Sequence, residues 1–88
     1  MNYVITHHFI KDNITESMMK PHVEYLRGLL TRGKLVLTGP FLDKERGGMF
    51  ILEVENESEL HEIVNNDPAI LDGLSRSEVR PFKIVFQR

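Results

Sequence analysis

The sequence predicts an α+β fold with the element order β-α-β-β-α-β. Three observations support this order. Short runs rich in β-branched and aromatic residues, typical of strands, begin and end the 88-residue chain and flank its middle. Two intervening stretches have apolar residues at helical spacing. The second and third strand candidates are joined by only a short polar loop. This order is that of an antiparallel ferredoxin-like sheet with both helices on one face.

Residues 3–10, YVITHHFI, form the first predicted strand. The following helix is expected to have Ser17 as its N-cap, Pro21 in or near its first turn and a stop at Gly33. Its predicted apolar stripe has the spacing i, i+4, i+7, i+11 and consists of Met19, Val23, Leu26 and Leu30.

The middle of the chain contains a predicted hairpin. Residues 34–41 form the second predicted strand, and Gly39-Pro40 ends or bends it. Residues 42–48 form the loop, in which Gly47 and Gly48 are expected to supply positive φ. Residues 49–54, MFILEV, return as the third strand.

The last third of the chain carries two helix starts. Asn56 followed by Glu59 is a capping pair that opens the second helix. Asp67-Pro68 opens one more helical turn, which Gly73 closes. Residues 78–86, EVRPFKIVF, form the fourth predicted strand.

The predicted strands carry apolar residues on both faces, although a half-exposed antiparallel sheet normally alternates apolar and polar residues. The face away from the helices therefore needs a cover, and a second copy of the chain is the commonest one. We predict a homodimer that packs sheet against sheet. The residues concerned are Leu35, Val36, Leu37, Phe41, Val79, Phe82, Ile84, Val85 and Phe86.

The composition limits the function classes. Residues 1–88 make one domain, with 27% charged residues and a net charge of −2. A slightly acidic chain is a poor match for nucleic acid or an anionic membrane. The absence of cysteine excludes disulfides and thiolate chemistry. With no predicted signal peptide or apolar span, we expect a cytoplasmic protein.

His22 is the strongest candidate for a catalytic residue. It lies beside the apolar stripe of the first helix, where an imidazole can act as a general base near neutral pH. The alternative is a histidine that only shields the core. A base needs an orienting acceptor, for which we nominate Asp67. Asp67 can also serve merely as a helix cap, and a carboxylate has enough acceptor sites for both roles.

The other candidate functional residues have weaker sequence support. His7 and His8 are adjacent in a strand and point to opposite faces, so they cannot share one metal ion. Metal-binding and cofactor-binding spacings are absent, so neither a metal nor a cofactor is expected. Gly39, Pro40 and Phe41 form either a plain strand end or a corner that a ligand approaches. Lys20 either attracts an anionic substrate or is an ordinary solvated charge.

Taken together, these segments resemble the YciI-like (YCII-related) family. The match covers essentially the whole chain, in the family's order and spacing. Its motifs are KPHVEYL at 20–26, GKLVLTGPF at 33–41, GGMFIL at 47–52, Asp67-Pro68 and VRPFKIVF at 79–86. The resemblance implies a ferredoxin-like fold of the dimeric α+β barrel class and a His–Asp site, which falls on His22 and Asp67 here. Lys20 stands where the family often has arginine, which can grip a carboxylate or phenolate with two parallel hydrogen bonds.

Two functions follow from the residues and the resemblance. One characterised relative is a dehydrochlorinase that acts on a chlorinated hydroxyhydroquinone, which implies cofactor-independent proton transfer of the lyase or isomerase type. The substrate expected is small and anionic or phenolic. The alternative is a non-catalytic module that senses a ligand or a partner with the same pocket, because the family includes versions attached to transcription-related proteins.

Overall fold

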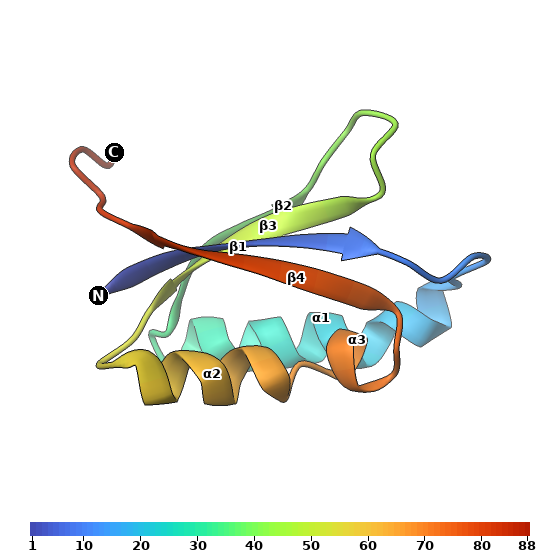
Figure 1. Cartoon of the computed structure of the whole chain (residues 1–88), viewed down its shortest axis with the longest axis horizontal. Helices are drawn as coiled ribbons and strands as arrows, with labels where there is room; N and C mark the ends of the chain where they lie inside the picture. Colours follow the sequence, from blue (N-terminus) through green and yellow to red (C-terminus); the bar gives the residue numbers. More distant parts are fainter.

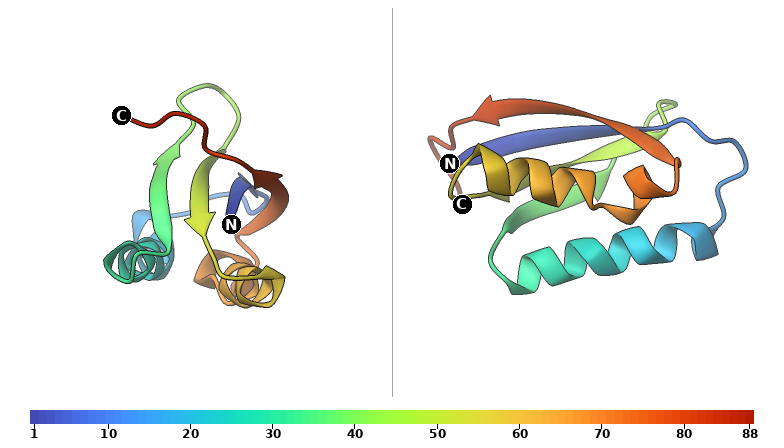
Figure 2. Two further views of the ribbon diagram at one scale, coloured as in Figure 1. Left: turned by 90° about the vertical axis from the view of Figure 1, so that its left-hand side faces the viewer. Right: turned by 60° about the horizontal axis from the view of Figure 1, so that its bottom comes forward.

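The computed structural model describes residues 1–88 and contains one antiparallel sheet with the strand order β2-β3-β1-β4. The helices cover one face of the sheet and leave the other bare (Figures 1 and 2). The predicted α+β, ferredoxin-like fold is confirmed. None of the helices combines the length and apolar character needed to cross a lipid bilayer. The elements are β1 Asn2–Phe9, α1 Glu16–Thr31, β2 Leu35–Pro40, β3 Gly47–Glu53, α2 Glu57–Asn65, α3 Pro68–Leu71 and β4 Ser75–Phe82.

Helix α1 starts earlier than the sequence indicated. Its N-cap is Thr15, whose backbone is extended and whose Oγ1 accepts a hydrogen bond from the amide of Met18 at 3.2 Å. Ser17 lies within the first turn, so the prediction that it caps the helix is wrong. Pro21 is the sixth residue of the helix and lies inside it. Gly33, with φ of +74°, follows the helix end as predicted.

The buried face of α1 also differs from the predicted stripe. His22, Leu26 and Leu29 are the buried residues, whereas Val23 and Leu30 are 44% and 56% exposed. Side-chain periodicity fixes the angular spacing of an apolar face, but contacts with the sheet decide which part of that face is covered. His22 is therefore a buried residue and not one at the border of the core.

Strand β4 begins and ends earlier than predicted. It pairs with β1 along that strand's whole length, from Phe9 opposite Ser75 to Asn2 opposite Phe82. Because the partner ends at Asn2, residues 83–86 have no strand to pair with. Val85 and Phe86 are consequently 71% and 95% exposed.

Alternate residues of β1 pack against the helices. Tyr3, Ile5 and His7 are buried on this face, and Tyr3 and Ile5 belong to the main core cluster. His8 is only partly covered, which confirms that the two adjacent histidines point to opposite faces. The sheet thus directs His7 into the layer that also holds His22.

Gly47 and Gly48 belong to β3, not to the loop before it, and neither has positive φ. Their role is close backbone approach. A Cβ on Gly47 would lie 2.0 Å from the carbonyl oxygen of His7, and one on Gly48 would lie 2.6 Å from that of Gly39. Glycine at these positions lets three strands come together where the ring of His7 is anchored.

Replacing Gly47 by Ala is expected to lower the free energy of unfolding by about 3 kcal/mol, at the upper end of overpacking effects, because the contact is with backbone. Gly28→Ala is the matched control. A Cβ on Gly28 meets nothing within 4 Å, and the helix should gain about 0.5–1 kcal/mol. Urea unfolding of both variants tests this. Equal stability of the two would contradict the assignment of Gly47 to a tight backbone contact.

Candidate active site

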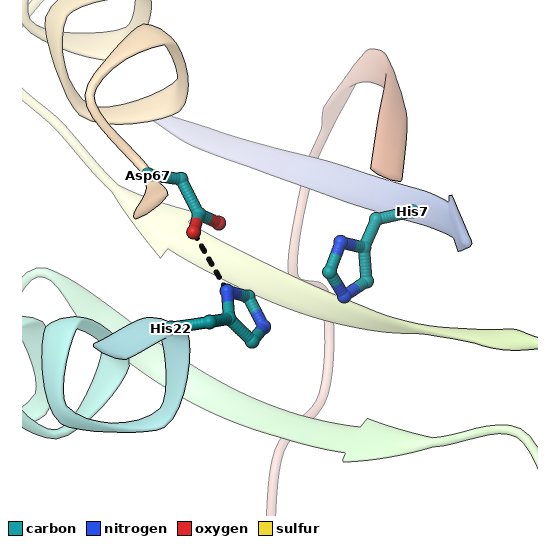
Figure 3. Close-up of side chains that lie close together, drawn as sticks. All are labelled: His7, His22 and Asp67. Carbon is teal, nitrogen blue, oxygen red and sulfur yellow. Dashed lines mark hydrogen bonds and ion pairs between the residues drawn. The ribbon is translucent and has the colours of Figure 1, made fainter. Parts of the chain in front are cut away.

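His22 on α1 and Asp67, the residue before α3, are in contact. Nδ1 of His22 lies 2.7 Å from Oδ1 of Asp67, and both side chains are at least nine-tenths buried. Figure 3 shows the carboxylate approaching the ring from the start of α3. Folding thus joins two side chains that are 45 positions apart in the chain.

Asp67 is held in place by its own helix. The same Oδ1 accepts a hydrogen bond from the amide of Ala69 at 2.9 Å, and Pro68 occupies the first position of α3. The predicted Asp-Pro helix start is therefore confirmed, and the cap fixes the direction of the carboxylate. With the carboxylate as acceptor, Nδ1 of His22 carries the hydrogen and Nε2 keeps a free lone pair. This is the tautomer that a general base requires.

The imidazole of His22 borders a cavity of about 470 Å³ between α1 and the ends of β2 and β3. Two predicted site residues, Gly39 and Pro40, contribute to its wall. Lys20 and Phe41 are exposed and lie outside the lining, so ligand contact by these two residues stays a prediction. The wall is mainly apolar and consists of Phe9, Met19, Val23, Leu26, Leu30, Leu35, Pro40 and Met49, with the polar or small residues His7, His22, Arg27, Thr38, Gly39, Gly47 and Gly48.

His7 is the residue of this site that sequence reasoning missed. Its ring lies beside that of His22, with centroids 4.7 Å apart and planes inclined by 30° (Figure 3). His7 is 4% exposed and lines the cavity. The sequence does indicate that His7 lies on the same strand face as Tyr3 and Ile5. Only the packing of the helices, however, shows that this face meets His22.

The surroundings of His7 favour its neutral form. Burial is the main cause that lowers its pKa from 6.5 to about 4. The nearby His22 and His8 lower the pKa further, and the carboxylate of Asp67 partly opposes them. At neutral pH the site therefore contains an uncharged imidazole beside the one that contacts Asp67.

This pKa predicts acid sensitivity. Between about pH 6.5 and pH 4 the unfolded chain binds a proton at His7 that the folded chain does not, so stability falls as the pH falls. The expected loss from this residue is about 2 kcal/mol at pH 5 relative to pH 7.5. Urea unfolding at both pH values measures it. His7→Phe lacks the titrating group, and the same pH dependence in that variant would contradict the assignment.

His7, His22 and Asp67 are residue types that can also bind a metal ion. One nitrogen or oxygen atom from each of His7, His22 and Asp67 lies within 4.8 Å of the others. Tetrahedral zinc ligands lie closer, about 3.3 Å apart for bonds of 2.0–2.1 Å. Oδ1 of Asp67 is already occupied by His22 and by the amide of Ala69. The three atoms are therefore spread more widely than the ligands of a tetrahedral zinc ion.

Comparison with known proteins places the chain in a family. The model of the YCII-related domain matches residues 1–83. The chain belongs to the YCII-related family. This YCII-related protein is 32% identical over 63 residues to the uncharacterized protein YjpA of Bacillus subtilis, a match that covers 72% of this chain and 73% of YjpA. The predicted family is thereby confirmed.

A solved structure has the same fold. It is the 5-chloro-2-hydroxyhydroquinone dehydrochlorinase TftG of Burkholderia phenoliruptrix in complex with 2,5-dihydroxybenzoquinone. The two chains superpose with a TM-score of 0.75 at 25% sequence identity, and the match covers 94% of each chain. The ferredoxin-like fold of this YCII-related protein, of the dimeric α+β barrel class, is therefore shared over nearly its whole length.

Proposed function

We propose that this YCII-related protein is an enzyme that moves a proton on a small anionic or phenolic compound without a cofactor. The observation that carries the proposal is the 2.7 Å contact between Nδ1 of His22 and Oδ1 of Asp67 beside a largely apolar cavity. In this reading His22 and Asp67 are the catalytic pair. Gly39 and Pro40 form part of the substrate wall, and Lys20 and Phe41 assist from outside the cavity lining.

The proposed reaction follows from the tautomer of His22, which has its hydrogen on Nδ1 and a lone pair on Nε2. Nε2 of His22 accepts a proton from a substrate hydroxyl and returns it to a ring carbon, which converts a phenol to its keto form. Asp67 stabilises the imidazolium that exists between the two transfers. If that carbon carries chlorine, chloride can then leave with its bonding electrons while a second hydroxyl loses a proton. The sum of these steps is loss of HCl and formation of a quinone.

Two features support a hydroxylated aromatic substrate. The apolar walls of the cavity suit a planar ring, and the few polar groups at the wall suit its oxygens. The dehydrochlorinase that shares this fold was solved with a dihydroxybenzoquinone bound. Arg27 also lines the cavity, and its positive charge can attract a negatively charged ligand.

A substrate panel in deuterated buffer tests the proposal. The panel contains chlorinated hydroxyhydroquinones and their chlorine-free analogues. We expect the protein to accelerate chloride release from the former and deuterium incorporation at ring carbons of the latter. A protein that binds these compounds without accelerating either reaction would be the ligand-sensing module instead. Failure to bind any of them would reject the proposed substrate class.

We further propose that the chain is a homodimer that covers the bare face of the sheet, in a cytoplasmic setting. Val4 lies opposite Ile51 and Leu37 also pairs with Ile51, so apolar side chains adjoin on that face. Leu37 and Phe82 are each nearly half exposed in the single chain. Light scattering should give twice the chain mass, and Leu37→Lys should shift the mass toward the monomer. A monomeric parent protein would contradict the dimer.

A further inference from the structure

His7 has a buried nitrogen that the fold does not use. Nδ1 of His7 is fully buried and has no hydrogen-bond partner. Burying a polar atom without a partner costs stability, so such an atom calls for an explanation. The explanation has to account for the choice of histidine at this place.

Packing alone does not require a histidine here. The neighbours of the ring include Phe9 and Phe50, with ring centroids 5.1 and 6.0 Å away. A phenylalanine at position 7 would also meet these rings and would bury no nitrogen. The ring of His7 does, however, line the cavity beside His22.

The burial of Nδ1 also decides the tautomer. A buried N–H without an acceptor is rarer in proteins than an acceptor without a donor. A neutral His7 therefore keeps its hydrogen on Nε2 and leaves the lone pair on the buried Nδ1. Figure 3 shows Nε2 at the end of the ring away from β1. The ring thus offers the cavity a donor.

The charges around His7 agree with this state. The groups that face it are His22 from α1, Asp67 from the start of α3 and His8 from its own strand. Asp67 contacts His22 directly, and its carboxylate raises the pKa of the nearby His7. The ring of His22, at a centroid distance of 4.7 Å, disfavours a positive charge on His7. Burial is the main cause of the lowered pKa of His7, and the neighbouring His22 and His8 lower it further.

We propose that His7 is a substrate-binding residue whose Nε2–H donates a hydrogen bond to a carbonyl or phenolate oxygen of the ligand. The inference rests on the proposed function and narrows its substrate class to compounds with such an acceptor oxygen. The two histidines then have complementary tautomers. His22 presents a lone pair that takes a proton, and His7 presents a hydrogen that stabilises the negative oxygen left behind.

Nitrogen-15 NMR of the histidine rings tests the tautomer without any ligand. We expect His7 to be neutral at pH 7, with its hydrogen on Nε2, and His22 to have a hydrogen on Nδ1. A His7 ring with its hydrogen on Nδ1, or a charged His7 ring at pH 7, would overturn the proposal. This measurement uses the unmodified protein and does not depend on the folding of any variant.

Binding measurements test the hydrogen bond itself. The probes are 2,5-dihydroxybenzoquinone, which carries acceptor oxygens, and 1,4-dimethylbenzene, a similar ring without them. His7→Phe should weaken binding of the quinone about 10- to 100-fold, as expected for a lost hydrogen bond to a charged group, and leave the hydrocarbon unaffected. His7→Gln should recover part of the affinity, since its amide can donate. His61→Phe, on the exposed face of α2, is the control that should change neither affinity.

The outcomes separate this inference from the proposed function. Unchanged quinone affinity in His7→Phe overturns the role of His7, whether or not the protein is catalytic. Weakened affinity without turnover in the parent protein supports His7 as a binding residue and rejects catalysis. If the parent protein binds no quinone, both proposals fail. The melting temperature of His7→Phe, measured first, verifies that this variant is folded.

Discussion

Replacing His22 by Asn is expected to lower the rate of proton transfer about 10²- to 10⁴-fold, the usual contribution of a positioned general base. The affinity for a bound quinone should change little, because asparagine is polar and smaller than histidine and leaves the cavity wall intact. The rate of deuterium incorporation and the dissociation constant are the two measurements. A loss confined to the rate is what a catalytic base predicts.

His61→Asn makes the same chemical change on the exposed face of α2 and should leave both quantities unaltered. A rate that survives in His22→Asn would remove this residue from catalysis. If affinity and rate instead fell by the same factor, His22 would be a binding residue, as in a ligand-sensing module.

Replacing Asp67 by Ala is expected to lower the free energy of unfolding by about 2–4 kcal/mol. The substitution removes the cap of α3, worth about 0.5–2 kcal/mol. It also leaves the buried Nδ1–H of His22 without an acceptor, which costs about 1–3 kcal/mol. Urea unfolding at pH 7.5 provides the value.

Asn56→Ala is the matched control for this loss. Asn56 caps α2 through the amide of Glu59 at 2.9 Å in an exposed setting, so its removal deletes a cap and nothing else. We expect a loss of about 1 kcal/mol for this variant. If Asp67→Ala destabilised the protein no more than Asn56→Ala, the contact between Asp67 and His22 would contribute nothing to stability.

The order of the elements was predictable because periodicity and turn residues are local signals. The caps at Asn56 and Asp67 and the stop at Gly33 were read correctly for the same reason. Thr15, not Ser17, supplies the cap of α1, and the sequence does not distinguish them because both residue types suit that position. Element ends that depend on a partner strand, as in β4, have no local signal.

The site was only partly predictable. The family resemblance implies the pairing of Asp67 with His22, but no local signal predicts the contact, because the distance between two positions far apart in sequence depends on how α3 docks against α1. The burial of His22 was underestimated, since the sheet covers a different part of the α1 face than the apolar stripe indicated. His7 was missed because alternation along a strand separates two faces without saying which one the helices cover.

Because two contacts share Oδ1 of Asp67, the proposed activity should depend on the thermal stability of α3. The same atom anchors a helix of four residues and steadies the ring of His22. Local opening of a segment can require less free energy than unfolding of the whole domain. If α3 opens first on warming, the imidazole loses its orienting acceptor while the strands still hold together. Inactivation should therefore set in at a lower temperature than the loss of the sheet.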